Sequence, residues 1–391
     1  MRPESLLVAG VPFSPNLGDG LLARCVDEAV AQLGEAVATT FVDLAGRTDF
    51  APTTTTNAGR GRLLTTLASL PRPVGDAIGG TGAYMSTARK FRSGENAAAL
   101  AVDRPLIIGG GHLLSDEFLN FPAKIALLGQ HAAGRAAVAL GVGADANPSR
   151  SARYLFGRAF RQIDLRMVVA RDETTADVVH SIDSSIDVLV APDLGVLSAH
   201  LRPEQPRDPL PNRYDIGVSV ASPQSSHYHV GGPRDAAAVR TWWRTLLSTM
   251  AADRRILLFS NGSPEDEEFK REIADGLTGG GVAVADTPRT PDDLLELLAA
   301  SDQLIAQRLH AILPATVAGV GTLSVDPNPK VKAVMATAGL PLHEVSTSTV
   351  SDASGIRGVL DALSPADSRQ IDVAVDRCLG AVRTAIDRLA E

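Results

Sequence analysis

Two residues late in the chain have side chains suited to anion binding and proton transfer. Arg308 and His310 follow a short apolar run, Gln303–Ala306, and a helix-like run begins directly after them. As strand and helix, this pattern places both residues at the carboxyl end of a strand, where ligands bind in open α/β sheets. Arginine binds phosphate or carboxylate through paired hydrogen bonds, and histidine exchanges protons near neutral pH. The segment therefore predicts an anion site with an acid beside it; the alternative for His310 is a capping or core histidine.

A glycine-containing turn follows the first predicted strand. Asn16, Gly18 and Asp19 stand in the run that leads into a helix. We expect Gly18 to let the backbone approach a ligand and Asn16 and Asp19 to hold sugar hydroxyls. The alternative is structural, with Asp19 as a helix N-cap and Gly18 as a tight-turn residue.

Three consecutive glycines follow the third predicted strand. We interpret Gly109–Gly111 as a strand-to-helix turn in which Gly110 and Gly111 present backbone N–H groups to a ligand. The spacing matches neither the dinucleotide fingerprint nor a phosphate-binding P-loop. His112 then borders the ligand or has no role, and Asp116 is a base or, more commonly for its position, an N-cap.

Two further segments of the second half are candidates. Ser260, Asn261 and Gly262 follow a predicted strand and offer hydroxyl, amide and backbone donors to an anion, or cap the next helix. His227 and His229 resemble half of a metal site, but no Cys, His or Asp cluster completes it. We expect a loop contact, or no functional role, for these histidines and no bound metal.

Charged residues follow other predicted strands. Arg171, Asp172 and Asp193 lie in the segments Ala170–Thr174 and Ala191–Gly195. We interpret these three as an internal ion-pair network that locks the turns, in preference to a catalytic set.

Composition limits the class of protein. A chain of 391 residues exceeds one ordinary core, so two domains are expected. A net charge of -8 argues against nucleic-acid binding, which favours a basic surface. Cys25 and Cys378 are expected to be reduced thiols. With no signal peptide and no apolar run long enough to span a bilayer, we expect a cytoplasmic protein, and association with the inner membrane stays open.

Short Val, Ile and Leu runs alternate with helical patterns, which is typical of parallel sheets with crossover helices. We predict an α/β fold of two Rossmann-like domains whose parallel sheets face a cleft. The expected parts are an N-terminal domain, 1–202, a proline-rich linker, 203–213, a C-terminal domain, 214–364, and a C-terminal helix, 365–391. The sequence leaves open whether this helix crosses back over the interface.

Taken in order, these segments resemble the polysaccharide pyruvyl transferase family. Its motifs are Asn-x-Gly-Asp, Gly-Gly-Gly with a following Asp, Gly-x-Gly, Arg-Asp-x-Ser/Thr, Pro-Asp, an Asp before a strand that leads to Arg-x-His, and a downstream Lys. The matching positions are Asn16–Asp19, Gly109–Asp116, Gly141–Gly143, Arg171–Thr174, Pro192-Asp193, Ser301-Asp302, Arg308–His310 and Lys330. The chain departs from the family at His112, where a small residue is common, and at Ala221 and Ser222, where many members carry an arginine.

The resemblance implies transfer of pyruvate from phosphoenolpyruvate to a sugar, usually as a cyclic ketal, on domains like those of GT-B glycosyltransferases. Phosphoenolpyruvate, a co-substrate and the only small molecule expected besides the sugar, would bind Arg308, Lys330 and the Ser260–Gly262 turn. His310 would be the general acid, and Asp19 or Asp116 would orient or deprotonate the acceptor. The acceptor-binding residues would be Asn16, Gly18, Asp19, Gly110, Gly111 and His112.

Two other functions remain open. One is a GT-B glycosyltransferase that uses a nucleotide sugar, with Arg308 on the diphosphate. The other is a sugar- or anion-binding protein without catalysis on the same scaffold. The acceptor can be free, nucleotide-linked or lipid-linked, and a homo-oligomer is an open alternative.

Overall fold

The computed structural model describes residues 4–33, 37–50, 66–67, 69–92, 94–201, 213–223, 235–277, 280–347 and 353–391. Most of the predicted linker, together with His227 and His229, lies outside these residues.

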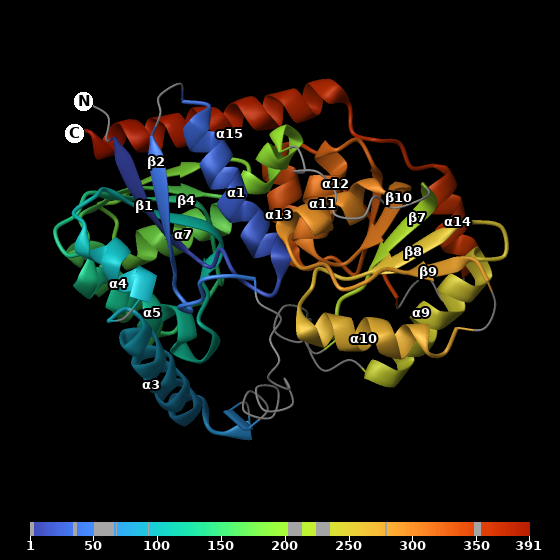
Figure 1. The fold of residues 1–391 in the computed structure, drawn as a ribbon, viewed down its shortest axis with the longest axis horizontal. Helices are drawn as coiled ribbons and strands as arrows, with labels where there is room; N and C mark the ends of the chain where they lie inside the picture. Colours follow the sequence, from blue (N-terminus) through green and yellow to red (C-terminus); the bar gives the residue numbers. More distant parts are fainter. Residues whose placement is uncertain are drawn as a thin grey trace.

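Two parallel six-stranded sheets form the framework, as predicted, one in each half of the chain (Figure 1). The first sheet has the order β2-β1-β3-β4-β5-β6. Its half of the chain contains β1 (Ser5–Gly10), α1 (Leu17–Ala31), β2 (Ala38–Asp43), α3 (Arg72–Lys90), α4 (Gly94–Ala101), β3 (Leu106–Leu114), η1 (Glu117–Leu119), α5 (Asn120–His131), β4 (Ala137–Ala144), α6 (Arg150–Gln162), β5 (Leu165–Ala170), α7 (Glu173–Ile182), β6 (Asp187–Val190) and η2 (Leu194–His200).

The second sheet has the order β12-β11-β10-β7-β8-β9. Its half contains β7 (Tyr214–Ser219), α9 (Ala236–Met250), β8 (Ile256–Phe259), α10 (Pro264–Ala274), β9 (Val282–Val284), α11 (Pro291–Ala299), β10 (Ser301–Ala306), α12 (Leu309–Val317), β11 (Gly321–Val325), α13 (Pro329–Ala338), β12 (His343–Val345) and α14 (Ala353–Asp361), and α15 (Ser368–Leu389) ends the chain.

The strand order places the candidate residues. In the first sheet the order changes direction between β1 and β3, and in the second between β7 and β10. Ligands of doubly wound sheets bind at the carboxyl ends of the strands beside such a switch point. The turn before α1 follows β1, and Arg308 follows β10, so the topology brings both candidate segments to switch points.

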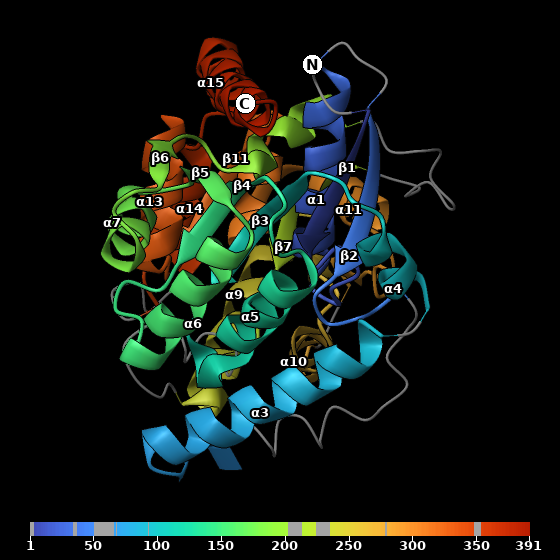
Figure 2. The same ribbon diagram turned by 90° about the vertical axis from the view of Figure 1, so that its left-hand side faces the viewer.

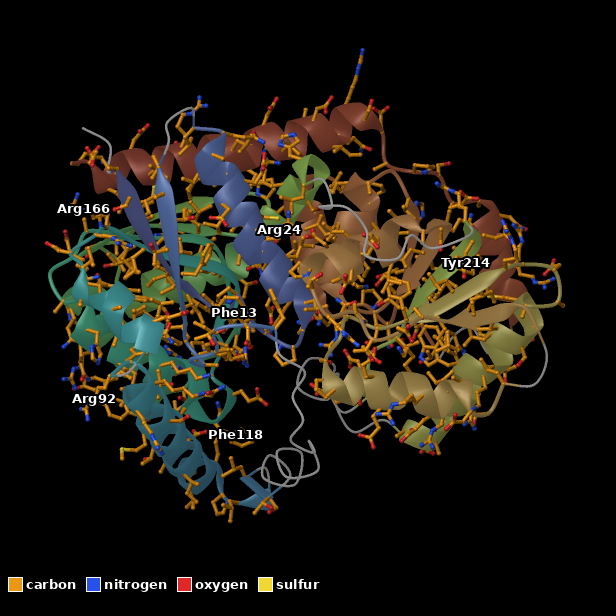
Figure 3. All side chains as sticks on the ribbon, viewed as in Figure 1. Phe13, Arg24, Arg92, Phe118, Arg166 and Tyr214 are labelled. Atoms are coloured by element: carbon orange, nitrogen blue, oxygen red, sulfur yellow. The ribbon has the colours of Figure 1, made fainter. Side chains whose placement is uncertain are left out.

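One apolar core joins the two halves. It includes Leu21 of α1, Leu197 of η2, Leu313 of α12 and Ile386 of α15, all at most 2% exposed. Figure 1 shows α15 running back from the second half across the first, where it packs on β4, β5 and η2. The side chain of Arg166, labelled in Figure 3, donates to the Arg388 carbonyl at the end of α15 at 2.9 Å. The C-terminal helix thus crosses back and holds the halves together.

The glycine segments differ from the prediction. Gly109–Gly111 is not a turn, because it lies inside β3, which continues to Leu114. Gly141–Gly143 likewise lies inside β4, which continues to Ala144. Gly110, Gly111 and Gly141 have φ of 69°, 87° and 58°, and the pairing of β3 with β4 shifts register after Gly111. Left-handed glycines here bulge the strands instead of ending them.

Candidate functional site

Arg308 and His310 occupy the predicted positions. β10 ends at Ala306, Arg308 is the extended N-cap of α12 at φ -88° and ψ 135°, and His310 lies in the first turn of α12. The rest of that short helix, from Ala311 onward, is buried. An apolar strand and an apolar helix therefore fix the two polar residues between them.

A buried carboxylate fixes the orientation of the Arg308 side chain. Its Nε and Nη2 donate to Asp266 Oδ2 at 3.0 and 2.6 Å, and Asp266 also accepts from the Ser222 backbone N–H at 2.7 Å. Burial opposes the charged form, but the attraction of Asp266 raises the pKa of the Arg308 guanidinium above its usual range. Arg308 Nη1 makes no hydrogen bond within the described part of the chain. This leaves one face of a permanent cation available to an anion.

His310 belongs to the second half but packs against the first. A Cβ placed on Gly18 would lie 2.5 Å from His310 Cβ and 3.2 Å from Nδ1, so only glycine fits there. The other ring nitrogen, Nε2, lies 3.8 Å from Asp193 Oδ1 and is buried without a hydrogen-bond partner. Gly18 and Asp193 thus hold the ring from opposite sides. We call the region where the carboxyl ends of the two sheets meet here the junction.

Asp193 is ionised and fully buried. Arg171 Nη1 donates to its Oδ2 at 3.2 Å, and the Gly195 backbone N–H donates to its Oδ1 at 2.8 Å. Burial alone would raise the pKa of Asp193, but attraction to His310 and Arg171 lowers it to about 2. The predicted ion pair is confirmed for Arg171 and Asp193, while Asp172 instead caps α7 through the Thr175 backbone N–H at 2.7 Å.

A second polar contact crosses the junction. Lys330 Nζ lies 2.8 Å from Asp145 Oδ1 and 2.7 Å from His112 Nε2, and His112 Nε2 lies 2.8 Å from the same Asp145 oxygen. Arg171 Nη2 reaches His112 Nδ1 at 3.4 Å, which links this group to the Asp193 pair. Burial lowers the pKa of His112, and the cations Lys330 and Arg171 lower it further against the opposing effect of Asp145.

The position of Lys330 differs from the expected donor-side grouping. We predicted it beside Arg308, but its contacts are with His112 and Asp145 of the first half. α13, which carries Lys330, follows β11, one strand further than β10 from the switch point.

The turn before α1 faces Arg308. Asn16 is the N-cap of α1, without a side-chain capping bond, and Asp19 lies in the first turn, so the N-cap alternative for Asp19 is wrong. Asp19 attracts the charge of Arg308, and its Oδ1 lies 3.8 Å from a Cβ placed on Gly111. Asn16 Oδ1 is buried and unpaired. Asp19 thus lies between the glycine-rich strand and the cation of the other half.

Hydrogen bonds connect the Ser260–Gly262 segment to itself, to α10 and to α1. Ser260 Oγ donates to Glu267 Oε1 at 2.5 Å and accepts from the Gly262 N–H at 3.0 Å, so this hydroxyl is occupied. The Asn261 carbonyl accepts from the Leu17 N–H at 2.9 Å across the junction. Asn261 Nδ2 is buried without a partner.

The hydrogen bonds of Asp116 give this residue a structural role. Its Oδ2 accepts from Arg72 Nη2 at 2.9 Å and from the Ser149 N–H at 2.6 Å, and its own N–H donates to Asp145 at 2.7 Å. The carboxylate therefore holds the start of α3 to the start of α6, and Asp19 is the better placed of the two candidate bases.

Several buried polar atoms of the junction have no partner. They include Asn16 Oδ1, Asn261 Nδ2, Ser263 Oγ, His310 Nε2 and Arg171 Nε. Native proteins pair nearly all such atoms, so a cluster of unpaired ones indicates a place for a ligand or water. No group of His, Cys, Asp and Glu able to hold a metal occurs among the described residues.

The residues missed as site components are Asp145, Asp193 and Asp266. Each follows a strand or opens a helix. The sequence predicts the pairing of Asp193 with Arg171 as a structural ion pair, whereas the partners of Asp145 and Asp266 lie far away in the chain and leave no local signal.

The buried pair predicts a large effect on stability. Asp193→Asn should lower the free energy of unfolding by about 3–5 kcal/mol, because Arg171 would remain buried without a counter-charge. Asp302→Asn, which removes an exposed ion pair with Arg213, should cost at most about 1 kcal/mol. Urea unfolding followed by circular dichroism measures both, and equal losses would contradict the assignment.

The environment of His112 predicts a pH dependence. A lowered pKa in the folded state means that the unfolded chain, with a pKa of about 6.5, binds the proton first on acidification. The free energy of unfolding should fall as the pH drops below about 6.5, by up to about 1.4 kcal/mol per pH unit from this group. His112→Gln should flatten that slope in urea unfolding at several pH values. Above about pH 8, where the imidazole is unprotonated in both states, the slopes of the two proteins should agree; an unchanged slope at lower pH would refute the prediction.

Comparison with known proteins places this geometry in a family. A model of the polysaccharide pyruvyl transferases matches residues 16–329, and no curated protein sequence is significantly similar to the chain. A putative UDP-N-acetylglucosamine 2-epimerase from Listeria monocytogenes has a similar structure, with a TM-score of 0.57 at 12% identity over 100% of this chain and 97% of the other. The S. aureus MnaA complex with UDP gives 0.54 at 10% identity over 100% and 98%. These likenesses show the fold, two Rossmann-like domains in the GT-B arrangement, and the family match covers both. The chain is a member of the polysaccharide pyruvyl transferase family.

Proposed function

We propose that this protein transfers pyruvate from phosphoenolpyruvate to two hydroxyls of a sugar and forms a cyclic ketal. Membership of the family supports a pyruvyl transferase that acts on a sugar. The observation that carries the finer proposal is the meeting of Arg308 and His310 of the second half with Asp19 and Asp193 of the first. An anion-binding cation, an acid and two carboxylates thus share one junction.

Arg308 binds the donor in this proposal. Its Nη1 faces away from Asp266, so the charge is fixed by one carboxylate while a donor group is left for the phosphate or carboxylate of phosphoenolpyruvate. The unpaired Asn261 Nδ2 supplies a further donor nearby. Lys330 adds positive charge from the far side of His112.

His310 acts as the general acid. Asp193 lies 3.8 Å from Nε2, and Nδ1, which faces the bare Gly18 backbone, delivers its proton to the methylene carbon of the enol. The central carbon becomes electrophilic, a first sugar hydroxyl adds to it, phosphate departs with the bridging oxygen, and a second hydroxyl closes the ketal. Of the two hydroxyl protons, one restores the imidazolium and the other leaves on phosphate.

Asp19 accepts the proton of the attacking hydroxyl and passes it to the departing phosphate, which regenerates the carboxylate. It lies in the first turn of α1 and close to Gly111, whereas the carboxylate of Asp116 is occupied by Arg72 and Ser149. The unpaired Asn16 Oδ1 and the backbone at Gly110 and Gly111 hold the other hydroxyls.

Donor binding can be tested by thermal unfolding. Phosphoenolpyruvate at about 100 times its Kd should stabilise the folded protein by about 2.7 kcal/mol and raise the melting temperature. Arg308→Gln should remove that rise, while Arg213→Ala, which alters an exposed arginine of the same half, should keep it. A rise with UDP and none with phosphoenolpyruvate would favour a nucleotide-sugar glycosyltransferase and contradict the proposal.

The acid role predicts a loss of turnover. His310→Ala should lower kcat by about 10²–10⁴-fold, the range typical of a positioned general acid, and leave the circular dichroism spectrum unchanged. Phosphate release from phosphoenolpyruvate in the presence of a sugar acceptor measures it. His180→Ala, at an exposed histidine on α7, is the matched control and should retain full activity. Undiminished turnover in His310→Ala would refute the assignment.

A further inference from the structure

No helix in the described ranges is long and apolar enough to cross a membrane. One helix of the first half nevertheless has an unusual outer face. α3 lies along the lower edge of the first half (Figures 1 and 2). Its inner side packs on Phe118, labelled in Figure 3, whose Cβ would lie 2.6 Å from a Cβ on Gly79.

The outer face of α3 presents several exposed apolar side chains and no charge between its two ends. Val74, Ile78 and Met85 are 45%, 50% and 65% exposed, and spacings of four and seven residues put them on one side of the helix. Between Arg72 and Arg89 the only charged residue is Asp76, which is buried. Exposed helices ordinarily carry charges on the solvent side, so this face is suited to contact with an apolar phase.

Basic residues border that face at the carboxyl end of α3 and also lie on α6. Arg89 and Lys90 end α3, and Arg92 follows, all exposed. α6 contains no acidic residue, and Tyr154 on it is 63% exposed. The exposed arginines of α6 are Arg150, Arg153, Arg158 and Arg161.

The two helices are linked at their first turns. Asp116 joins their first turns, because it accepts from Arg72 at the start of α3 and from Ser149, the N-cap of α6. α5 packs against both helices, and Figure 2 shows α3 below α5 and α6 on the same side of the sheet. We call the exposed residues of α3 and α6, with Arg92, the α3–α6 surface.

We propose that the α3–α6 surface binds an anionic lipid bilayer. An apolar stripe with a cationic border inserts its side chains among acyl chains and attracts acidic headgroups. The border is cationic although the chain as a whole carries a net charge of -8, so the complementarity is local to this surface. A second copy of the chain would bring like-charged borders together, and a nucleic acid would leave the apolar stripe without a partner.

The surface adjoins the junction. The Asp116 N–H donates to Asp145, which contacts His112 and Lys330. A sugar carried on a lipid would therefore arrive beside the candidate acceptor residues. This consequence rests on the proposed function, whereas binding to the bilayer does not.

Flotation of the full-length protein with vesicles tests the proposal. Binding should be strong to phosphatidylcholine vesicles that contain phosphatidylglycerol, weak to phosphatidylcholine alone, and reduced at high salt, which screens surface charge. The double variant Ile78→Glu/Met85→Glu should bind at least about tenfold more weakly, since it puts two anions against acidic headgroups. Arg150→Gln and Arg158→Gln should each weaken binding about fivefold. Val373→Glu, at a 55% exposed valine of α15, is the matched control and should bind like the unmodified protein.

Thermal unfolding of each variant shows that it is folded, and transfer to a water-soluble acceptor reports the proposed function separately. Unchanged vesicle binding by the folded Ile78→Glu/Met85→Glu variant would overturn the proposal. The proposal would also be overturned if the unmodified protein failed to bind vesicles. Sedimentation showing that this surface pairs two copies of the chain would have the same consequence.

Discussion

The buried carboxylate of Asp193 is the group on which the junction depends. It is fully enclosed, paired with Arg171, and placed 3.8 Å from a histidine of the other half of the chain. A charge in such a position is stable only while its partner is present. Arg171 in turn reaches His112, which contacts Lys330, so one continuous set of charges extends from His310 to the start of α13. The catalytic candidate in one half therefore lies against an ion pair in the other.

Apolar packing between the two halves holds these charged residues in place. The core that includes α1, η2, α12 and α15 is shared by both halves, and Arg24, labelled in Figure 3, makes an ion pair with Asp292 of α11. Within that frame the halves supply different chemistry. The second fixes a cation, Arg308, through Asp266, and the first presents the helix start at Asn16–Asp19. This division suits a reaction between an anionic donor and a polyhydroxy acceptor.

The sequence predicted the framework better than the contacts within it. Alternating apolar strands and helices indicated two parallel sheets. The apolar run before Arg308 and His310 correctly placed both residues at the carboxyl end of a strand. Gly109–Gly111 was misjudged because a run of glycines is compatible with a turn and with a bulged strand, and only the pairing with β4 decides. The three-residue strand β12 is too short to show a pattern. The contacts of Lys330 and the approach of His310 to Asp193 depend on how the two halves meet, which no local spacing encodes.

The most direct test of the account is analysis of the products formed from phosphoenolpyruvate and a set of sugars with neighbouring hydroxyls. Phosphorus NMR and mass spectrometry would follow phosphate release and the mass of the sugar together. The proposed reaction releases one phosphate for each sugar that gains a pyruvate ketal. Free pyruvate should form no faster than by spontaneous hydrolysis of phosphoenolpyruvate. Consumption of a nucleotide sugar while phosphoenolpyruvate remains intact would contradict it.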